Sequence, residues 1–313
     1  MEFDLIARIR ARAPARDDVV LGIGDDAALL QPAPGRQLVV TMDTLNAGVH
    51  FPPDTVPADI GWKSLAVNLS DLAAMGAAPA WCTLALSLPQ ADAGWLDGFL
   101  DGFLELATRH RVALVGGDTT RGPLSVCVTA HGLVEPGKAL RRDGAQVGDD
   151  VWVTGTLGDA AGALAAMRSG AVSERALRAR LDRPTPRVEA GLALAGLANA
   201  CIDVSDGLLA DLGHVCTASG VGAMVELEAL PASPALARFR PELRWPWQAT
   251  GGDDYELCFT APPERRDAVL RSLADAGGVT ATRIGRIEAG EGVRAIRPDG
   301  DDWEPASAGF QHF

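Results

Sequence analysis

The sequence lacks the features that mark membrane and secreted proteins. No apolar run approaches the roughly 18 residues that a membrane-spanning helix needs. The segment from Met1 to Arg8 contains no apolar stretch typical of a secretory signal peptide. We therefore expect a cytoplasmic protein with no membrane partner.

Cysteine is scarce and its spacing is uninformative for metal binding. The five cysteines are an odd number, they form no C-x-x-C pair, and most lie within apolar runs. They are Cys82, Cys127, Cys201, Cys216 and Cys258. This pattern indicates reduced core residues rather than a disulfide framework or a zinc site.

Basic residues are also few. The chain has 28 Lys and Arg against 41 Asp and Glu, which gives a net charge of -13. A strongly acidic surface repels phosphate backbones, so nucleic acid and anionic membranes are not expected partners. For the same reason, a phosphorylated substrate would require divalent cations to lie between its charges and those of the protein.

A functional phosphate-binding P-loop is absent as well. Residues 132–138 match G-x-x-x-x-G-K, but the next position, which must carry a Ser or Thr hydroxyl for Mg²⁺, is Ala139. Glu135 inside the match would add negative charge near the phosphates. We therefore reject residues 132–138 as the phosphate-binding loop of a nucleotide site.

The composition that remains is that of a large globular protein. The 313 residues are 47% hydrophobic, enough to bury a sizeable core and to form two domains. Helical and strand patterns mix in both halves, which predicts an α/β or α+β fold. We place the N-terminal domain at 1–137, a polar, Gly-punctuated connection at 138–147 and the C-terminal domain at 148–313.

Periodicity predicts the main elements. Helices are expected at 3–13, 61–79, 93–110, 157–167, 174–181, 187–199, 205–219 and 262–276. Strands are expected at 37–42, 81–88, 112–115, 124–134, 150–154, 201–203, 222–228, 255–260, 280–287 and 293–297.

The predicted helix at 61–79 has an unusual composition. We expect Asp59 to cap its N-terminus, and Gly76 followed by Pro79 to end it. One stripe at helical spacing is apolar: Leu65, Leu69 and Leu72. The neighbouring stripe, Ser64, Asn68, Asp71 and Met75, has no Lys or Glu, so we do not expect it to face solvent. The Asp71 carboxylate on this stripe would need a cation to compensate its charge.

Aspartate recurs in five further Gly-rich or strand-end settings. They are 22–28 with Asp25 and Asp26, 41–44 with Asp43, 116–120 with Asp118, 203–207 with Asp203 and Asp206, and 251–257 with Asp253 and Asp254. We expect Asp43 and Asp118 to follow the ends of their strands, where open α/β sheets place ligands. Several convergent aspartates in an acidic chain without a P-loop indicate metal-assisted phosphoryl transfer.

In this order, the motifs resemble those of the thiamine-monophosphate kinase family within the aminoimidazole ribonucleotide (AIR) synthetase-like superfamily. The matching segments are Gly22-Ile-Gly-Asp-Asp26, Val67-Asn-Leu-Ser-Asp-Leu-Ala-Ala-Met-Gly76, Gly116-Gly-Asp-Thr-Thr-Arg-Gly122, Ile202-Asp-Val-Ser-Asp-Gly-Leu208 and Asp254-Tyr-Glu-Leu-Cys-Phe259. The resemblance implies direct in-line transfer of the γ-phosphoryl group of ATP to thiamine monophosphate, the last step of thiamine diphosphate biosynthesis. It also implies a two-domain AIR synthetase-like fold with a mixed α/β C-terminal domain, and a homodimer whose N-terminal sheets pair into a barrel.

The resemblance further implies roles for particular residues. Several Mg²⁺ ions would be held by Asp26, Thr41, Met42, Asp43, Asp71, Asp118, Asp203 and Asp206, with Met42 acting through its backbone carbonyl. ATP would contact Gly117, Asp118, Arg142 and Ser205. Thiamine monophosphate would contact His50, Asp253 and Phe310. The catalytic set would be Asp26, Asp43, Asp71 and Asp118.

Structural roles remain open for some of these residues and their neighbours. Asp25 and Asp254 can form turns or caps, and Ser205 with Asp206 can be the N-cap of a helix. His50 can be structural, and Phe310 can fill the core instead of lining a substrate site. We interpret Asp211 and His214, at i and i+3 on the predicted helix 205–219, as structural.

Other functions fit the sequence less well. Selenophosphate synthetase would need a reactive Cys or selenocysteine near the N-terminus, but no Cys precedes Cys82. The hydrogenase-maturation relative would need a C-terminal Cys, but the sequence ends in Gln-His-Phe313. AIR synthetase itself is disfavoured by the Asp254-Tyr-Glu-Leu motif and by His50. A catalytically silent acidic metal-binding protein is disfavoured by the lack of an EF-hand loop.

Overall fold

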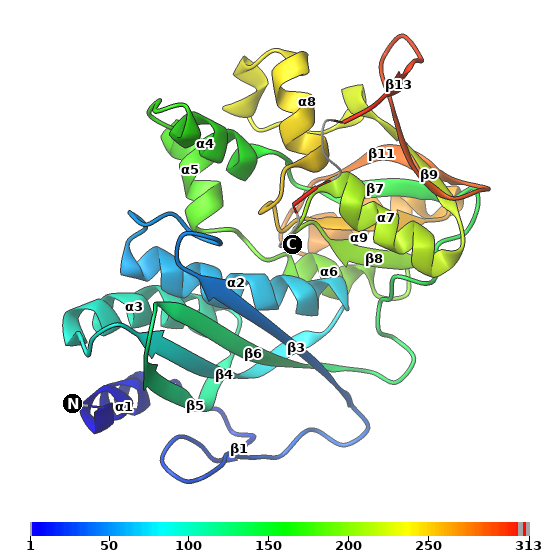
Figure 1. Cartoon of the computed structure of the whole chain (residues 1–313). Coiled ribbons are helices and arrows are strands. Elements are labelled where there is room, and N and C mark those ends of the chain that lie inside the picture. Colours follow the sequence, from blue (N-terminus) through cyan, green and yellow to red (C-terminus); the bar gives the residue numbers. More distant parts are fainter. Residues whose placement is uncertain (1, 306–308, 311–313) are drawn as a thin grey trace. The chain divides into compact units, whose positions relative to one another are not determined.

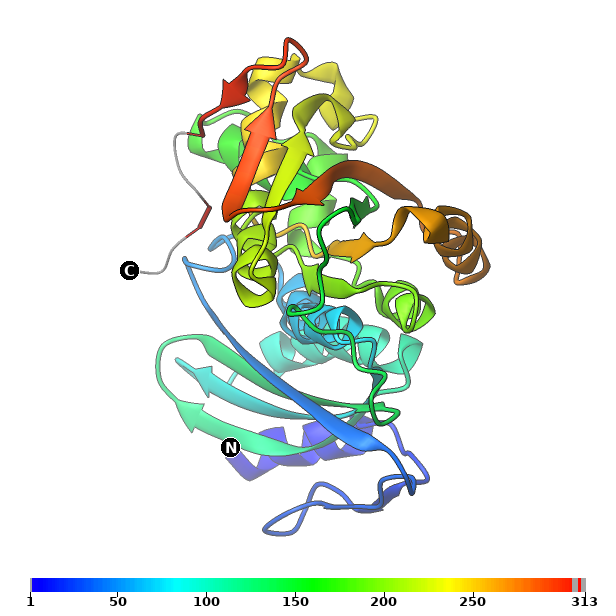
Figure 2. The same ribbon diagram turned by 90° about the vertical axis from the view of Figure 1, so that its right-hand side faces the viewer.

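The structure is a computed structural model that describes residues 2–305 and 309–310 (Figures 1 and 2). The chain divides into two compact units. Unit 1 comprises residues 1–72 and 77–137, and unit 2 comprises residues 73–76 and 138–313. Each unit has its own sheet.

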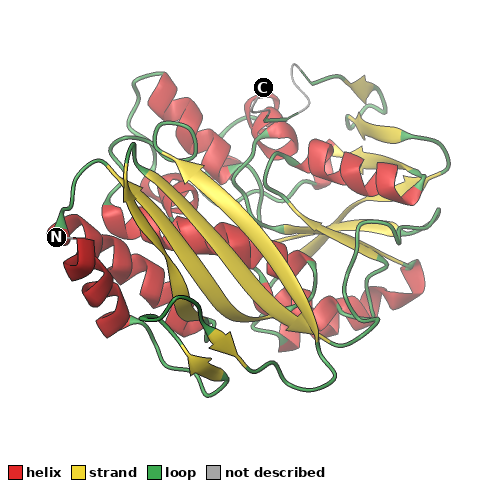
Figure 3. Cartoon of the chain, turned by 60° about the horizontal axis from the view of Figure 1, so that its bottom comes forward, coloured by secondary structure: helices red, strands yellow, loops and turns green. Residues whose placement is uncertain are grey.

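Unit 1 is built on a four-stranded sheet with the strand order β3-β6-β4-β5. Figure 3 shows its long strands side by side. The elements in chain order are α1 (Glu2–Arg12), β1 (Val19–Leu21), β2 (Leu29–Leu30), β3 (Gln37–Asn46), α2 (Pro57–Ala74), β4 (Ala78–Leu88), α3 (Ala93–Arg109), β5 (Ala113–Arg121) and β6 (Ser125–Val134). Strands β4 and β5 are parallel, while the β3–β6 and β6–β4 pairs are antiparallel.

The two faces of this sheet differ in burial. On β6, Val126, Val128 and Ala130 are fully buried, whereas the alternating residues are half-buried. On β3, the alternating residues Leu38, Val40 and Met42 are each more than half exposed. The exposed side of β3 is therefore an apolar surface within unit 1.

Helix α2 confirms most of the expectation for this stretch. Leu65, Leu69 and Leu72 are completely buried, and so are Ser64 and Asn68. Gly76 adopts a φ of 63°, and the Ala77 N–H donates to the Leu72 carbonyl, which ends the helix as predicted.

The predicted N-cap was wrong. The helix begins at Pro57, so Asp59 lies inside its first turn. Proline suits the first helical position because its φ is already helical and it has no N–H group to leave unpaired.

Helices α2 and α3 approach so closely that glycine is required on both. A Cβ atom at Gly61 would lie 2.0 Å from the Phe99 carbonyl oxygen, and one at Gly102 would lie 1.7 Å from the Ala58 carbonyl oxygen. These two glycines therefore fix the distance between the helices.

Unit 2 is built on a seven-stranded sheet with the order β13-β12-β9-β11-β7-β10-β8. Its strands are β7 (Asp150–Thr154), β8 (Ala200–Asp203), β9 (Gly222–Glu226), β10 (Leu257–Ala261), β11 (Ala281–Glu288), β12 (Gly292–Ile296) and β13 (Asp302–Trp303). All neighbours are antiparallel except β12 and β9. Both units thus combine helices with sheets, and the mixed α/β class is confirmed.

Helices and short 3₁₀ turns surround the sheet of unit 2. The helices are α4 (Asp159–Arg168), α5 (Arg175–Asp182), α6 (Val188–Leu194), α7 (Leu208–Ser219), α8 (Pro241–Thr250) and α9 (Arg266–Asp275), and the 3₁₀ turns are η1 (Leu227–Ala229), η2 (Leu236–Arg238) and η3 (Pro263–Arg265). Helix α7 lies against the sheet of unit 2 (Figure 1), and its Leu208, Leu212 and Val215 belong to one buried core cluster with residues of the strands. Helix α8 was not predicted, because Pro246 inside it interrupts the helical pattern.

Two strand ends were predicted wrongly. Strand β3 continues to Asn46 and β5 continues to Arg121, so Asp43 and Asp118 lie within strands. The reason is pairing: β3 pairs with β6 along its full length, and β5 pairs with β4 as far as Arg121 opposite Leu88. Asp203 is, as expected, the last residue of β8.

Three features discussed for the sequence can be located among the described residues. No helix follows Lys138 before α4, so the G-x-x-x-x-G-K match has no P-loop geometry there. All five cysteines are free, and four of them are buried. In the described part of the chain, no helix combines the length and apolar character of a membrane span.

We predict that Gly102→Ala lowers the free energy of unfolding by about 1–3 kcal/mol, because the added methyl group forces α2 and α3 apart. Urea denaturation measures this loss. The matched control is Gly94→Ala on the same helix, where the new Cβ meets nothing closer than 3.4 Å. Alanine there should be neutral or slightly stabilising. Equal effects of the two changes would contradict the close helix contact.

Candidate active site

In unit 1, strand β3 and helix α2 bring three predicted metal-binding side chains together. The Thr41 hydroxyl donates a short hydrogen bond to Asp71 Oδ2. Asp43, two residues along the same face of β3, shares a hydrogen bond with Asp71. Burial, the Asp71 charge and this hydrogen bond raise the pKa of Asp43 to about 7. The cluster is defined here as the Asp43–Asp71 pair with Thr41.

Two carboxyl groups this close cannot both stay ionised without a positive charge between them. Either a proton or a cation must fill that role. The cluster offers only oxygen atoms, which are the ligands that Mg²⁺ prefers. Asn68, one turn earlier on α2, has a buried Oδ1 atom with no hydrogen-bond partner among the described residues. The residues present therefore fit a Mg²⁺ ion.

Met42 lies on β3 between Thr41 and Asp43, whereas the predicted ligands Asp118 and Asp26 lie elsewhere on the surface of unit 1. Asp118 is exposed on β5, at the opposite edge of the sheet from β3, and its Oδ1 accepts the Thr119 N–H. Asp26 is exposed in the loop between β1 and β2, and the carboxylate of Asp25 accepts its N–H, which is the turn role expected for Asp25. Over the described ranges, no three His, Cys, Asp or Glu residues are grouped so as to hold a metal ion.

Two more predicted residues of unit 1 have identifiable backbone settings. Gly117 has a φ of 147°, and a Cβ atom there would lie 1.8 Å from the Leu84 carbonyl oxygen, so only glycine fits beside β4. His50 accepts the Asn46 N–H through Nδ1 at 2.9 Å, and its carbonyl accepts a hydrogen bond from the buried Lys63 at 2.9 Å. These two hydrogen bonds fix the position of His50 in the loop after β3.

In unit 2, the predicted residues Ser205 and Asp206 lie in the loop between β8 and α7. Helix α7 begins at Leu208, and its N-cap residue, Gly207, receives no side-chain cap. The expectation that Ser205 or Asp206 caps the helix was wrong. The side chain of Asp211, in the first turn of α7, instead accepts through Oδ2 the N–H groups of the three residues before the helix, Ser205, Asp206 and Gly207.

The interpretation of Asp211 as structural is confirmed, but its three contacts with the preceding loop were not predicted. Its position in the first turn of α7 is a usable signal, since a carboxylate there interacts favourably with free N–H groups. Burial, and then the charge of Asp206, raise the pKa of Asp211 to about 7, although its three backbone hydrogen bonds act in the opposite direction. Asp211 is thus more than a residue of the helix surface.

The segment Asp253–Glu256 is held in an uncommon backbone conformation. Asp253 and Tyr255 have φ values of 68° and 50°, which non-glycine residues seldom adopt. The Tyr255 hydroxyl donates to Asp253 Oδ1 at 3.1 Å. Asp254, which lies between these two residues, and Glu256, which follows Tyr255, are both buried. Strain of this kind persists only where the surroundings fix it.

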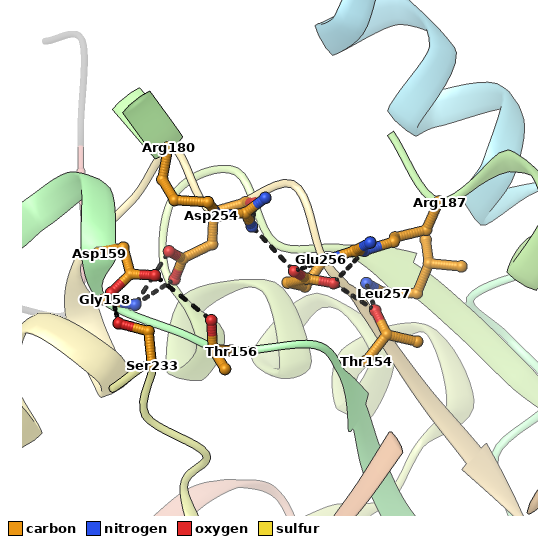
Figure 4. Close-up of polar contacts among 10 residues, drawn as sticks. All are labelled: Thr154, Thr156, Gly158, Asp159, Arg180, Arg187, Ser233, Asp254, Glu256 and Leu257. Carbon is orange, nitrogen blue, oxygen red and sulfur yellow. Dashed lines mark hydrogen bonds and ion pairs between the residues drawn. The ribbon is translucent and has the colours of Figure 1, made fainter. Parts of the chain in front are cut away.

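Figure 4 shows what fixes the segment. Both oxygens of Asp254 accept the Gly158 N–H just before α4, at 2.9 and 3.0 Å, which confirms the capping interpretation of this residue. Burial raises the pKa of Asp254 well above its ordinary value. Arg180 donates both to the Asp254 carbonyl, at 3.0 Å, and to Glu256, at 2.8 Å.

Glu256 is the centre of a buried ionic cluster. It is completely buried and accepts hydrogen bonds from Arg180, from Nε and Nη2 of Arg187 at 2.6 and 2.5 Å, and from the Thr154 hydroxyl at 2.7 Å. Two guanidinium groups compensate the cost of burying one carboxylate. The cluster joins α5, the start of α6, β7 and β10, and thereby holds Asp253 and Tyr255 in place.

Three predicted residues of unit 2 remain. Asp203, at the end of β8, is 4% exposed. Phe310 is 47% exposed, so it is not a core residue, and its N–H donates to the Asp206 carbonyl at 3.0 Å. Arg142 has an exposed side chain, and its carbonyl accepts the Ser219 hydroxyl.

Comparison with known families places the chain in a defined class. Residues 24–134 match the family model for the N-terminal domain of AIR synthase related proteins, and residues 146–297 match the model for the C-terminal domain. These matches define the class of the fold.

Comparison with individual proteins narrows the class. The chain is 49% identical to the thiamine-monophosphate kinase of Escherichia coli over 324 aligned positions, which cover 100% of this chain and 98% of that protein. The chain belongs to the thiamine-monophosphate kinase family.

Solved structures agree with this assignment. A crystal structure of thiamine-monophosphate kinase from Stenotrophomonas maltophilia is 59% identical, with a TM-score of 0.89, and the match covers 96% of this chain and 98% of that one. A structure described as AaThiL complexed with AMPPCP and TMP is 33% identical, with a TM-score of 0.79, covering 99% and 96% of the two chains. The resemblance seen in the motifs is therefore confirmed over the whole chain.

We predict that Glu256→Gln lowers the free energy of unfolding by about 3 kcal/mol, because two guanidinium groups lose their buried counter-charge. Urea denaturation followed by circular dichroism measures the change. Glu288→Gln is the control, since Glu288 pairs with exposed Arg286 and Arg294 and should cost less than about 1 kcal/mol. A loss at position 256 no greater than at position 288 would contradict the central role of Glu256.

Proposed function

We propose that this protein transfers the γ-phosphoryl group of ATP to the phosphate of thiamine monophosphate, giving thiamine diphosphate and ADP. The observation that carries the proposal is the 49% identity to the Escherichia coli thiamine-monophosphate kinase across both full chains. The structure titled AaThiL complexed with AMPPCP and TMP supports the pairing of a nucleotide with thiamine monophosphate in a relative.

In the proposed reaction, an oxygen of the thiamine phosphate forms a bond to the γ-phosphorus of ATP. The bond from that phosphorus to the β,γ-bridging oxygen breaks, and its electron pair leaves with ADP. A phosphate oxygen is already a competent nucleophile, so no activated side chain is required, and we favour direct in-line transfer. The work of the protein is then to position the phosphates and to compensate their charge.

Aspartates would supply that compensation by holding Mg²⁺. The Asp43–Asp71 pair with Thr41 supports this role, because it brings the oxygen atoms of two carboxyl groups and a hydroxyl group close together. Bound Mg²⁺ would neutralise phosphate charge and stabilise the transferring group. The remaining proposed ligands are Asp26, the Met42 carbonyl, Asp118, Asp203 and Asp206.

The proposed substrate contacts follow the family motifs. Gly117, Asp118, Arg142 and Ser205 would contact ATP, and the Arg142 guanidinium, which is exposed, is suited to phosphate. His50, Asp253 and Phe310 would contact thiamine monophosphate. Asp253 offers a carboxylate to the cationic thiazolium ring, and the half-exposed Phe310 ring offers an apolar surface.

A direct assay tests the proposal. Purified protein is incubated with ATP, Mg²⁺ and thiamine monophosphate, and the thiamine species are separated; EDTA and free thiamine serve as controls. Thiamine diphosphate should appear from the monophosphate only, and EDTA should prevent it. If ATP stays intact, the kinase proposal is wrong. If ATP is hydrolysed without formation of thiamine diphosphate, the acceptor is a different molecule.

In the same assay we predict that Asp71→Asn lowers the turnover number about a hundredfold, because the change keeps the shape but removes the charge that faces Asp43. Its thermal stability should stay near that of the parent. Asp59→Asn, in the first turn of the same helix, is the control and should retain activity. Near-normal turnover of Asp71→Asn at saturating Mg²⁺ would exclude Asp71 as a central ligand.

We further propose that unit 1 forms a homodimer in which two such sheets pair into a barrel. The support is the apolar surface on β3, where Leu38, Val40 and Met42 are exposed. An apolar strand face of this kind calls for a covering partner. A second copy of the chain fits, since the family resemblance implies that arrangement.

Sedimentation should therefore give twice the mass of the chain, and Val40→Glu should shift the protein toward the monomer. Val172→Glu is the control, because Val172 is 98% exposed in a loop of unit 2. A monomeric parent protein, or a Val40→Glu variant that remains dimeric, would rule out this surface as the interface.

A further inference from the structure

The loop Val204–Gly207 of unit 2 has every backbone polar group bonded within the protein. The Val204 N–H donates to the Glu256 carbonyl, and the Tyr255 N–H donates to the Val204 carbonyl, both at 2.8 Å. The carbonyls of the next three residues accept the N–H groups of Asp253, Phe310 and Asp211 respectively, at 2.9, 3.0 and 3.0 Å. The three remaining N–H groups, those of residues 205–207, donate to Asp211. A loop bonded this completely has little freedom to move.

A single atom, Asp211 Oδ2, accepts all three of those N–H groups. The distances are 3.0 Å to Ser205, 3.1 Å to Asp206 and 3.1 Å to Gly207. Asp211 is 3% exposed, so these hydrogen bonds are shielded from water. Hydrogen bonds to a charged acceptor are stronger than neutral ones. Asp211 is therefore the main anchor on the N–H side of the loop.

The carbonyl side of the loop connects to different residues. The Ser205 carbonyl accepts the Asp253 N–H, and the carbonyl of the next residue, Asp206, accepts the Phe310 N–H. Close packing accompanies both contacts: a Cβ at Gly252 would lie 2.4 Å from the Ser205 carbonyl oxygen, and one at Gly309 would lie 2.9 Å from the Asp206 carbonyl oxygen. A displacement of the loop must therefore displace Asp253 and Phe310 with it.

We propose that Asp211 is a positioning residue for both substrates, and that the loop it anchors links the nucleotide-binding residues Ser205 and Asp206 to the thiamine-binding residues Asp253 and Phe310. This inference rests on the proposed function, which assigns those four residues to ATP, Mg²⁺ and thiamine monophosphate. Asp211 itself contacts neither substrate. It acts by fixing the position of the loop Val204–Gly207, which contains Ser205 and Asp206 and is hydrogen-bonded to Asp253 and Phe310.

Kinetics of Asp211→Asn test the proposal. Asparagine keeps the shape but weakens three hydrogen bonds, so kcat/KM should fall about tenfold or more for ATP and also for thiamine monophosphate. The matched control is Asp149→Asn. Asp149 is also 3% exposed and accepts the Gln146 N–H at 3.0 Å, but it precedes β7, at the other end of the strands from the loop. If both variants lose the same activity, Asp211 is only a structural residue and the proposal is overturned.

A double-mutant cycle with Phe310→Ala separates positioning from general weakening. Once the Phe310 ring is gone, Asp211→Asn should raise the KM for thiamine monophosphate by a smaller factor than it does in the parent protein. Its effect on the KM for ATP should be unchanged. Additive effects on the KM for thiamine monophosphate would show that Asp211 does not act through Phe310.

Hydrogen exchange of the unmodified protein provides a test that does not depend on a variant folding. Mg²⁺ with a non-hydrolysable ATP analogue should slow exchange of the amides of residues 205–207 and also of Asp253 and Phe310, although no thiamine compound is present. Protection confined to 205–207 would overturn the proposed link. Failure of the parent protein to make thiamine diphosphate would instead contradict the proposed function, so the two failures are distinguishable.

Discussion

Buried carboxylates that accept N–H groups hold the loops of unit 2 in place. Asp211 accepts hydrogen bonds from three backbone N–H groups, and Asp254 accepts one from the Gly158 N–H. Glu256 accepts hydrogen bonds from the guanidinium groups of two arginines. Each of these side chains is at most 3% exposed. A buried carboxylate is costly unless such partners surround it, so the partners and the acids depend on one another. The strained backbone at Asp253 and Tyr255 exists because this network surrounds it.

The aspartates of unit 1 are arranged differently. Asp43 and Asp71 face each other, and Asp118 and Asp26 are exposed. Asp43 and Asp71 share a hydrogen bond, and the Thr41 hydroxyl also donates to Asp71. The chain thus uses carboxylates in two ways. In unit 2 they accept N–H groups and hold loops, and in unit 1 this cluster brings oxygen atoms together, an arrangement suited to a metal ion.

The sequence was informative wherever a single element decides the outcome. The buried stripe of α2 and the stop at Gly76 follow from local spacing, and they were predicted correctly. The ends of β3 and β5 were predicted wrongly. The length of these strands depends on their pairing with β6 and β4, which local sequence patterns do not encode. The proximity of Asp43 to Asp71 could be suspected only from shared motifs, since 28 positions separate them.

Asp211 shows a second limit of reading a sequence. A carboxylate in the first turn of a helix is common, and nothing local says that it reaches back over three residues. That role depends on Gly207, which has a φ of 124°. A Cβ atom at this position would lie 2.7 Å from the Thr250 carbonyl oxygen. Tertiary packing therefore decided what the side chain does. The same holds for Phe310, whose half-exposed position could not be read from the sequence.

Tyr255 is the one tyrosine in the sequence, and its hydroxyl donates to Asp253. Uniform incorporation of fluorotyrosine would therefore introduce a single ¹⁹F nucleus type at this position without any change in the gene. Its NMR signal would need no assignment, and it would report on the environment of Asp253 directly. The chain thus carries a built-in spectroscopic probe for titrating ligands into the C-terminal unit.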